Sequence, residues 1–196
     1  MRNIILQEFI SLDGMAAGPD DSVEFVPAAT QGDQSFGARQ LAFMDSIDAI
    51  LLGRKTYEMF ADHWPNVTSG DDKAFADRIN AIPKIVFSRS LSRAPWGKYA
   101  EATIIKDQAT EEVAKLKQQP GKSMVLWGSL SIAQVLEDNG LIDEYQLIVC
   151  PVVLGTGRRM FREGTDGYEL SLRETRSFDS GVVLLSYAPA RAQSAV

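Results

Sequence analysis

The sequence predicts an α/β fold in which a mixed, mostly parallel sheet carries antiparallel strands at its C-terminal end and is flanked by helices. Two stretches support this prediction. Residues 48–60 and 123–136 each change from an apolar, strand-like run to helical spacing at a glycine, Gly53 and Gly128. The order of the elements is a third observation, because strands and helices alternate up to residue 139 and only strands and turns follow.

The first part of the chain predicts two strands and two helices. Residues 4–10 are rich in β-forming side chains and end at a Ser-Leu-Asp-Gly turn, so we expect a core strand there. The small residues 13–21 predict a loop, which either moves over a ligand or merely turns the chain. Residues 36–45 predict a short helix, and residues 48–53 predict a buried strand that leads into a helix at Arg54.

The middle of the chain continues this alternation. Residues 71–80 predict a helix, and a proline after it opens a strand over residues 84–87. A short strand over residues 103–105 and an exposed helix over residues 110–118 follow. Residues 123–127 are mostly apolar and predict a strand that is covered on both faces.

The turn after residues 123–127 is the clearest candidate for a ligand site. Ser131 and Gln134 have the spacing of a capping box, so we expect the next helix to begin at Ser131. Gly128 and Ser129 would then precede a helix N-terminus, where free N–H groups and the helix dipole favour a phosphate. An ordinary strand-to-helix connection is the alternative, and this stretch alone favours neither.

Two further turns carry groups that suit an anion. The helix dipole disfavours cations at a helix start, so a bound anion explains the two cations and the hydroxyl after residues 48–53 better than solvation alone. These side chains belong to Arg54, Lys55 and Thr56. Two hydroxyls around an arginine after residues 84–87 could bind the extra phosphate of a phosphorylated dinucleotide, although such residues are common in any exposed turn. They belong to Ser88, Arg89 and Ser90.

The C-terminal part of the chain has the pattern of antiparallel strands joined by turns. We expect one domain over residues 1–188 and a disordered tail over residues 189–196. The predicted strands cover residues 144–154, 168–178 and 181–187.

Composition limits the function classes. With 196 residues, 45% hydrophobic and 23% charged, the chain has the composition of an ordinary globular protein. The net charge of −6 argues against general nucleic-acid binding. Cys150 is the single cysteine, which excludes an internal disulfide, and His63 has no apparent metal partner. No apolar run approaches membrane-spanning length and no signal peptide is apparent, so we expect a cytoplasmic protein without a membrane partner.

Five blocks of the sequence occur in an order that carries a family resemblance. They are residues 11–14 (SLDG), 52–58 (LGRKTYE), 127–130 (WGSL), 141–144 (LIDE) and 151–161 (PVVLGTGRRMF). Together they resemble the dihydrofolate-reductase-like superfamily, and most closely the branch related to the C-terminal reductase domain of bacterial riboflavin-biosynthesis deaminase-reductases. The resemblance implies a three-layer, NADPH-binding fold and a homodimer. A homodimer would also cover the many apolar residues of the segment 168–187.

The resemblance also implies where the cofactor binds. The nicotinamide would lie near Ala16 and the Trp127-Gly128 turn, and the 2′-phosphate near Arg54 and the Ser88-Arg89-Ser90 segment. The pyrophosphate would lie between two turns, formed by Gly53, Arg54, Lys55 and Thr56 and by Gly128, Ser129 and Leu130. In dihydrofolate reductases the turn equivalent to Trp127-Gly128 holds two glycines joined by a cis bond, and we expect the cis geometry to persist here.

The sequence departs from both parent groups in the substrate region. Dihydrofolate reductases carry an acidic residue early in the helix that corresponds to residues 36–45, and residues 36–40 contain none. We therefore expect no useful dihydrofolate reductase activity. The riboflavin-pathway reductases would show a threonine and an acidic residue ahead of an Asn-Pro element, whereas residues 59–64 read Met-Phe-Ala-Asp-His-Trp.

The function that these observations favour is an NADPH-dependent reductase of a small carbonyl, imine or pterin- or pyrimidine-like substrate. A nucleotide-binding or redox-sensing module that kept the cofactor site without catalysis is the alternative. Asp13 and Tyr57 are the nearest candidates for a proton donor, and solvent is an equal one. The expected substrate cleft is lined, beside Ala16, by Gln7, Phe9, Phe36, Tyr57 and Trp64.

Overall fold

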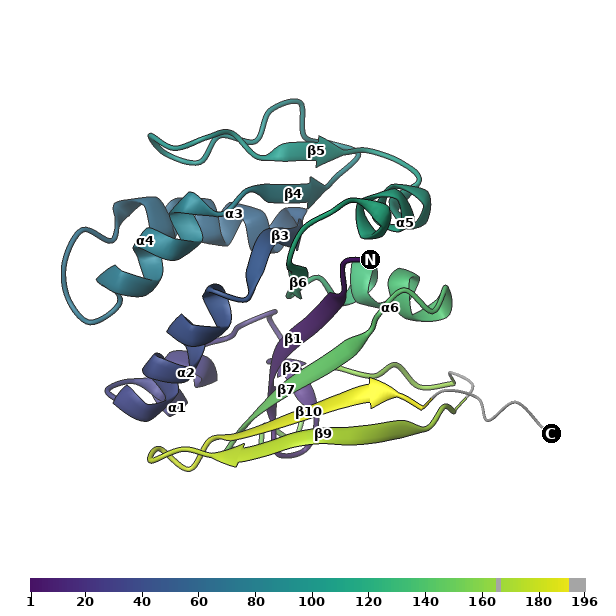
Figure 1. The fold of residues 1–196 in the computed structure, drawn as a ribbon. Helices are drawn as coiled ribbons and strands as arrows, with labels where there is room; N and C mark the ends of the chain where they lie inside the picture. The colour runs from purple at the N-terminus through teal and green to yellow at the C-terminus, as the bar shows by residue number, and fades with distance from the viewer. Residues whose placement is uncertain (165–166, 191–196) are drawn as a thin grey trace. The chain divides into compact units, whose positions relative to one another are not determined.

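The computed structural model of the protein describes residues 1–164 and 167–190, which form two compact units (Figure 1). The first unit comprises residues 1–6 and 34–142, and the second comprises residues 7–33 and the described residues between 143 and 190. The strand β1 (Ile4–Ser11) contributes to both units.

The first unit contains the parallel part of the predicted sheet. Its strands besides β1 are β3 (Ile47–Gly53), β4 (Lys84–Phe87), β5 (Thr103–Ile105) and β6 (Ser123–Trp127). The strand β3 pairs in parallel with both β4 and β6, and β4 pairs in parallel with β5. Consecutive residues such as Leu51 and Leu52 are both fully buried, which is typical of parallel strands covered on both faces.

Helices pack against these strands and bury their apolar side chains. The core residues Leu52, Val86 and Val125 of three strands lie in one cluster with Phe43 and Ile79 of two helices. The helices of the first unit are α2 (Gln34–Met44), α3 (Arg54–His63), α4 (Lys73–Ala81), α5 (Ala109–Gln118) and α6 (Leu130–Asp138), with a 3₁₀ turn η1 (Trp64–Asn66).

The second unit is mainly antiparallel. The strand β7 (Glu144–Cys150) pairs with β10 (Val183–Pro189), which in turn pairs with β9 (Leu170–Ser177). Together with the strands of the first unit they form the eight-stranded order β5-β4-β3-β6-β1-β7-β10-β9. The predicted mixed, mostly parallel α/β sheet with antiparallel C-terminal strands is therefore confirmed.

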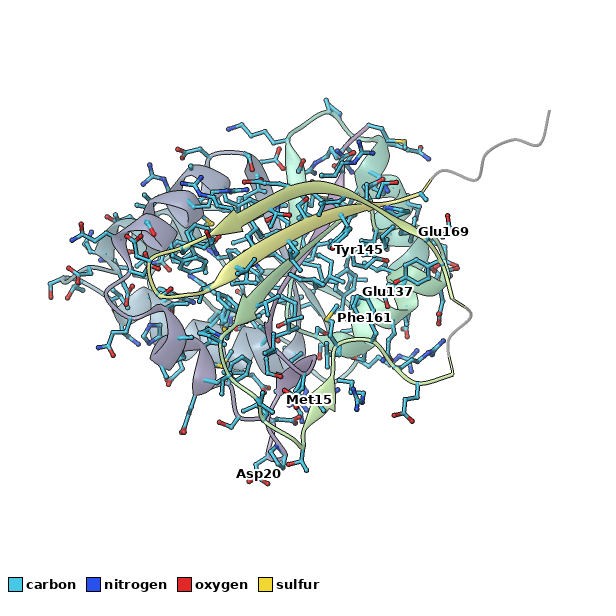
Figure 2. The ribbon with its side chains drawn as sticks, turned by 90° about the horizontal axis from the view of Figure 1, so that it is seen from below. Met15, Asp20, Glu137, Tyr145, Phe161 and Glu169 are labelled. Atoms are coloured by element: carbon cyan, nitrogen blue, oxygen red, sulfur yellow. The ribbon has the colours of Figure 1, made fainter. Side chains whose placement is uncertain are left out.

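Smaller elements complete the second unit. A short helix α1 (Phe25–Thr30) precedes the return of the chain to the first unit. The strand β2 (Met15–Ala17) pairs with β8 (Arg158–Arg159). The rings of Tyr145 and Phe161 stand 6.2 Å apart, and both residues are labelled in Figure 2.

Several predicted boundaries needed correction. The helix predicted over residues 71–80 starts two residues later, and the strand predicted over residues 144–154 ends at Cys150 because a proline follows. The helix α1 and the strands β2 and β8 were missed, because they are short and the two strands gain their hydrogen bonds from each other across about 140 residues. The last strand includes Pro189, and residues 191–196 of the predicted tail lie outside the described part of the chain.

No helix in residues 1–164 and 167–190 is both long and apolar enough to cross a membrane.

Candidate functional site

The first unit brings the two glycine turns of the prediction side by side. The strands β3 and β6 are neighbours, and Leu52 is paired with Trp127. Gly53 therefore lies beside Gly128 at the carboxyl ends of two parallel strands, where ligands of open α/β sheets usually bind. Both turns lead directly into a helix, α3 or α6.

The two turns interlock through their glycines. A Cβ atom added to Gly53 would overlap the hydroxyl oxygen of Ser129 and come within 2.6 Å of Ser129 Cβ. A Cβ atom added to Gly128 would lie 2.6 Å from the Oγ1 atom of Thr56. Each turn thus leaves room only for a hydrogen atom where the other turn contributes a side chain, so the two turns position each other.

The β6 turn has an unusual backbone. Gly128 and Ser129 both have left-handed φ angles, of 57° and 59°. A serine in this region is uncommon, and such residues concentrate at functional sites. The peptide bond between Trp127 and Gly128 is trans, as is every peptide bond of the described residues, so the predicted cis bond is wrong. Two consecutive left-handed residues reverse the chain here without one.

The start of α6 also differs from the prediction. The helix begins at Leu130 with Ser129 as its N-cap residue, so Ser131 lies inside the first turn and the capping box predicted for Ser131 and Gln134 is wrong. Within the described residues, no side chain caps the N-terminus of α3 or of α6. The backbone N–H groups at both helix starts are consequently not satisfied by side-chain caps, which suits them to an anionic ligand.

The two predicted arginines at this edge of the sheet are paired with carboxylates. The Nη1 atom of Arg54 lies 3.0 and 3.1 Å from the two carboxylate oxygens of Glu58, one helical turn later. The Nε atom of Arg89 donates to Asp107 over 3.1 Å. Lys55 is exposed in the first turn of α3. A phosphate at this edge would therefore compete with carboxylates for the arginines.

The serines beside Arg89 have different surroundings. Ser88 is buried, and its hydroxyl oxygen accepts hydrogen bonds from the backbone N–H groups of Ser90 and Leu91 over 3.3 and 3.2 Å. Ser90 is exposed, and its hydroxyl is 3.4 Å from that of Ser88. Ser88 thus shapes the turn, whereas Arg89 and Ser90 present their side chains to solvent.

Lys106 is a cation at the same edge that sequence reasoning missed. Gly53 pairs with Phe87, and Phe87 pairs with Ile105, so the residues that follow these three come into line at the ends of β3, β4 and β5. They are Arg54, Ser88 and Lys106. The signal available in the sequence was the position of Lys106 directly after the short strand 103–105, but its proximity to Ser88 depends on strand pairing.

Of the aromatic residues predicted to line the substrate cleft, Trp64 lies in a cluster of rings whose other members were not predicted to line it. The ring of Trp64 lies 6.1 Å from that of Phe60 and 5.1 Å from that of Phe75. The ring centroids of both phenylalanines also lie 6.1 Å from the ring centroid of Trp127. Trp64 and Trp127 thus belong to the same cluster. Phe36 is buried on α2.

Tyr57 is buried and engaged with the backbone. Its hydroxyl donates a hydrogen bond of 2.6 Å to the carbonyl oxygen of Pro95. Burial, followed by the negative charges of Glu101 and Glu58, raises the pKa of Tyr57 above its usual value. This geometry does not support the predicted role of Tyr57 as a proton donor.

Asp13 joins two loops of the second unit. Its carboxylate accepts hydrogen bonds from the Ser11 hydroxyl over 2.6 Å and from the backbone N–H groups of Leu154 and Gly155 over 3.1 and 2.8 Å. These bonds, the one from Ser11 foremost, lower the pKa of Asp13 to about 2. The carboxyl group is therefore ionised at neutral pH, which does not support a role as proton donor.

The loop that follows Asp13 is attached to the β8 segment. Met15 and Ala17 pair with β8, and a Cβ atom added to Gly157 would overlap the carbonyl oxygen of Ala17. Ala16, the residue predicted near the nicotinamide, is only 5% exposed. Of the two interpretations of residues 13–21, the structure supports a turn that is fixed by its neighbours.

Gln7 belongs to a buried polar chain that the sequence did not reveal. Its Nε2 atom donates to Gln146 over 2.8 Å, and Gln146 donates to Glu144 over 2.7 Å. The hydroxyl of Ser186 donates to the same oxygen of Glu144 over 2.8 Å. The carboxylate only accepts, so the direction of each amide in the chain is determined. Phe9, two residues further on the same strand, is half-buried.

Comparison with known proteins gives a consistent result. A sequence model of the RibD C-terminal domain matches residues 2–184. The chain is 34% identical over 187 residues to the "Uncharacterized protein YyaP" of Bacillus subtilis (strain 168), covering 95% of this chain and 94% of that protein.

Two solved structures share the fold. A Shewanella sp. PV-4 protein with a provisional riboflavin-biosynthesis name has a TM-score of 0.74 at 19% identity, covering 96% of this chain and 99% of that one. The Thermotoga maritima diaminohydroxyphosphoribosylaminopyrimidine deaminase/5-amino-6-(5-phosphoribosylamino)uracil reductase has a TM-score of 0.66 at 14% identity. The match covers 96% of this chain and 57% of that protein.

Proposed function

Because the chain belongs to the RibD C-terminal domain family, we propose that it is an NADPH-dependent reductase that transfers a hydride to a small carbonyl, imine or pterin- or pyrimidine-like substrate. One observation carries the proposal: the turns after β3 and β6 interlock and lead into two helix N-termini without side-chain caps, with arginines beside them. Such an edge suits a ligand with several phosphates.

The groups on this edge fit a phosphorylated dinucleotide. Backbone N–H groups near Gly53 and Gly128 would hold the pyrophosphate, with Ser129 and Leu130 at the start of α6. Arg54 and the exposed Arg89 and Ser90 would hold the 2′-phosphate, with Lys55 and Thr56 adding a charge and a hydroxyl nearby. NADPH, when bound, supplies the hydride. The protein contributes binding, orientation and the exclusion of water.

A pyrimidine-like ring is the substrate class that we favour. The Thermotoga maritima protein that shares this fold is named as a 5-amino-6-(5-phosphoribosylamino)uracil reductase as well as a deaminase. Gln7 supports the choice, because Gln146 and Glu144 determine the orientation of its amide. An amide of defined orientation can distinguish a ring carbonyl from a ring N–H group.

We also infer a homodimer. The strand β9 ends the strand order of the sheet, and strands at an edge offer unpaired backbone groups to a second chain. Leu172 on β9 is 57% exposed and Tyr168 before it is 48% exposed. A two-fold interface over these residues would cover them.

A second candidate function is a nucleotide-binding or redox-sensing module without catalysis. It is favoured by the environments of Asp13 and Tyr57, since the carboxyl group of Asp13 is ionised and the hydroxyl of Tyr57 donates its hydrogen bond to a backbone carbonyl. Adding NADPH and a panel of carbonyls and dihydropterins, and following the cofactor absorbance, distinguishes the two functions. Turnover of any panel member supports the reductase, and tight NADPH binding without turnover supports the module.

The cofactor assignment is tested by Arg89→Ala. We expect the wild-type protein to bind NADPH at least roughly tenfold more tightly than NADH, because hydrogen bonds to charged groups contribute about 1.5–3 kcal/mol. Arg89→Ala should remove most of that preference. The control is Arg78→Ala, which removes an arginine from α4 that pairs with Asp45. Equal dissociation constants for the two cofactors in the wild type would contradict the assignment.

A further inference from the structure

We propose that Asp107 sets how strongly the protein prefers NADPH to NADH, by placing a negative charge at the edge where the 2′-phosphate binds. The proposal rests on the proposed function, since it concerns the same cofactor. Beside the residues that attract the 2′-phosphate, the proposal identifies one residue that repels it.

The pairing of three strands brings Asp107 to this edge. Phe87 is paired with Gly53 on one side and with Ile105 on the other, and the backbone N–H group of Ser88 donates to the carbonyl oxygen of Ile105 over 3.0 Å. The segment after β5 therefore lies against the segment after β4. Asp107 comes two residues after Ile105 and reaches Arg89.

The contact between Arg89 and Asp107 neutralises charge without fixing the arginine firmly. It joins Nε of Arg89 to one carboxylate oxygen over 3.1 Å, so it engages neither terminal nitrogen of the guanidinium group. The two side chains are 85% and 71% exposed. Exposed ion pairs of this kind are weak, so a dianionic phosphate can displace the carboxylate. The carboxylate then remains near the phosphate and repels it.

Glu58 differs from Asp107 in this respect. It holds Arg54 through both carboxylate oxygens within one turn of α3. Its removal would change the position of the arginine together with the charge. Asp107 is the better candidate for a pure charge effect, because its single accepted hydrogen bond survives in an asparagine, whose Oδ1 atom still accepts from Nε of Arg89.

The expected effect is selective for NADPH. Replacing the carboxylate by a neutral amide removes repulsion of a 2′-phosphate that carries close to two negative charges, whereas NADH has no phosphate there. For charges several Å apart in a solvated site we expect Asp107→Asn to tighten NADPH binding by roughly three- to tenfold and NADH binding by less than about twofold. The gain should shrink as the salt concentration rises, because the groups are exposed.

The experiment is a titration of the intact protein with NADPH and with NADH at low and at high salt. Binding is monitored by calorimetry or by cofactor fluorescence. The matched control is Asp77→Asn on α4, which changes the net charge equally and likewise removes the carboxylate charge from an exposed ion pair, here with Lys73. A larger NADPH-to-NADH preference in Asp107→Asn than in Asp77→Asn, reduced by salt, is the expected result.

Two other outcomes overturn the inference and are distinguishable. If the wild type prefers NADPH but Asp107→Asn shifts the preference no more than Asp77→Asn does, the role of Asp107 is wrong and the proposed function stands. If the wild type binds neither cofactor, the proposed function is wrong, and this inference with it.

Discussion

The interlocked turns predict that Gly53→Ala destabilises the protein for a local steric reason. Gly53 has φ −82° and ψ 166°, which alanine adopts without strain, so the backbone itself imposes no cost. The added Cβ atom would instead overlap the Ser129 side chain and lie 2.6 Å from its Cβ atom. Overpacking of this kind typically costs 1–3 kcal/mol, and we expect about 2 kcal/mol here, because Ser129 sits in a turn with two left-handed residues.

The same geometry predicts which second substitution restores stability. In Ser129→Gly the atoms that cause the overlap are gone, and the remaining Ser129 Cα position is 3.7 Å from the added Cβ, an ordinary contact. Glycine also relieves the left-handed φ of 59° at this position. The double variant Gly53→Ala/Ser129→Gly should therefore be about as stable as the wild type. The coupling energy between the two substitutions should be about 2 kcal/mol.

Urea unfolding of the wild type, both single variants and the double variant measures this coupling directly. The control is Gly37→Ala in α2, where an added Cβ meets nothing within 4 Å; it should stabilise the protein by about 0.5–1 kcal/mol. NADPH affinity should fall in Gly53→Ala, since the displaced turn carries the proposed phosphate site. Equal destabilisation of the Gly53→Ala single and double variants would refute the interlocking of the turns.

Three further predictions concern other parts of the molecule. Lys84 is buried, donates to the carbonyl oxygen of Asn80 and lies over the Trp96 ring, and burial lowers its pKa from 10.5 to about 8. The unfolded chain therefore binds more protons than the folded one between these two pH values, and the free energy of unfolding of the wild type should rise with pH across this window by up to about 3 kcal/mol. Urea titrations of Lys84→Met should lack this rise. The lowered pKa of Asp13 stabilises the fold above pH 3.8, and this contribution is lost as the pH falls towards 2. Asp13→Asn should therefore be less stable at neutral pH and should lack this acid-dependent loss. If the unfolding midpoint of Asp13→Asn falls with acid as that of the wild type does, the bonds of Asp13 to Gly155 and its neighbours do not stabilise the fold as described. Light scattering at micromolar concentration should give twice the 21.5 kDa chain mass, and a monomer would count against the homodimer.

The candidate site was predictable in its residues but not in its geometry. The turns at Gly53 and Gly128 and the cation Arg89 could be identified because a strand, a glycine and a helix start follow one another in the sequence. The pairing of Arg89 with Asp107 could not, since the two residues are separated by a strand and a loop and meet only when β4 and β5 pair. The left-handed conformation of Ser129 was equally hidden, because serine has no preference for it.

The sequence by itself determined the order of most strands and helices, and it gave the bounds of the strands at 84–87 and 103–105 as the structure has them. These features depend on the spacing of apolar side chains over a few residues, and that spacing is present within each segment of the sequence. The tertiary structure alone decided the contacts across long separations: Gly53 against Ser129, Asp13 on the N–H group of Gly155, and β2 beside β8. Such contacts depend on which strands become neighbours, and that choice is made by the packing of the whole core rather than by any local pattern.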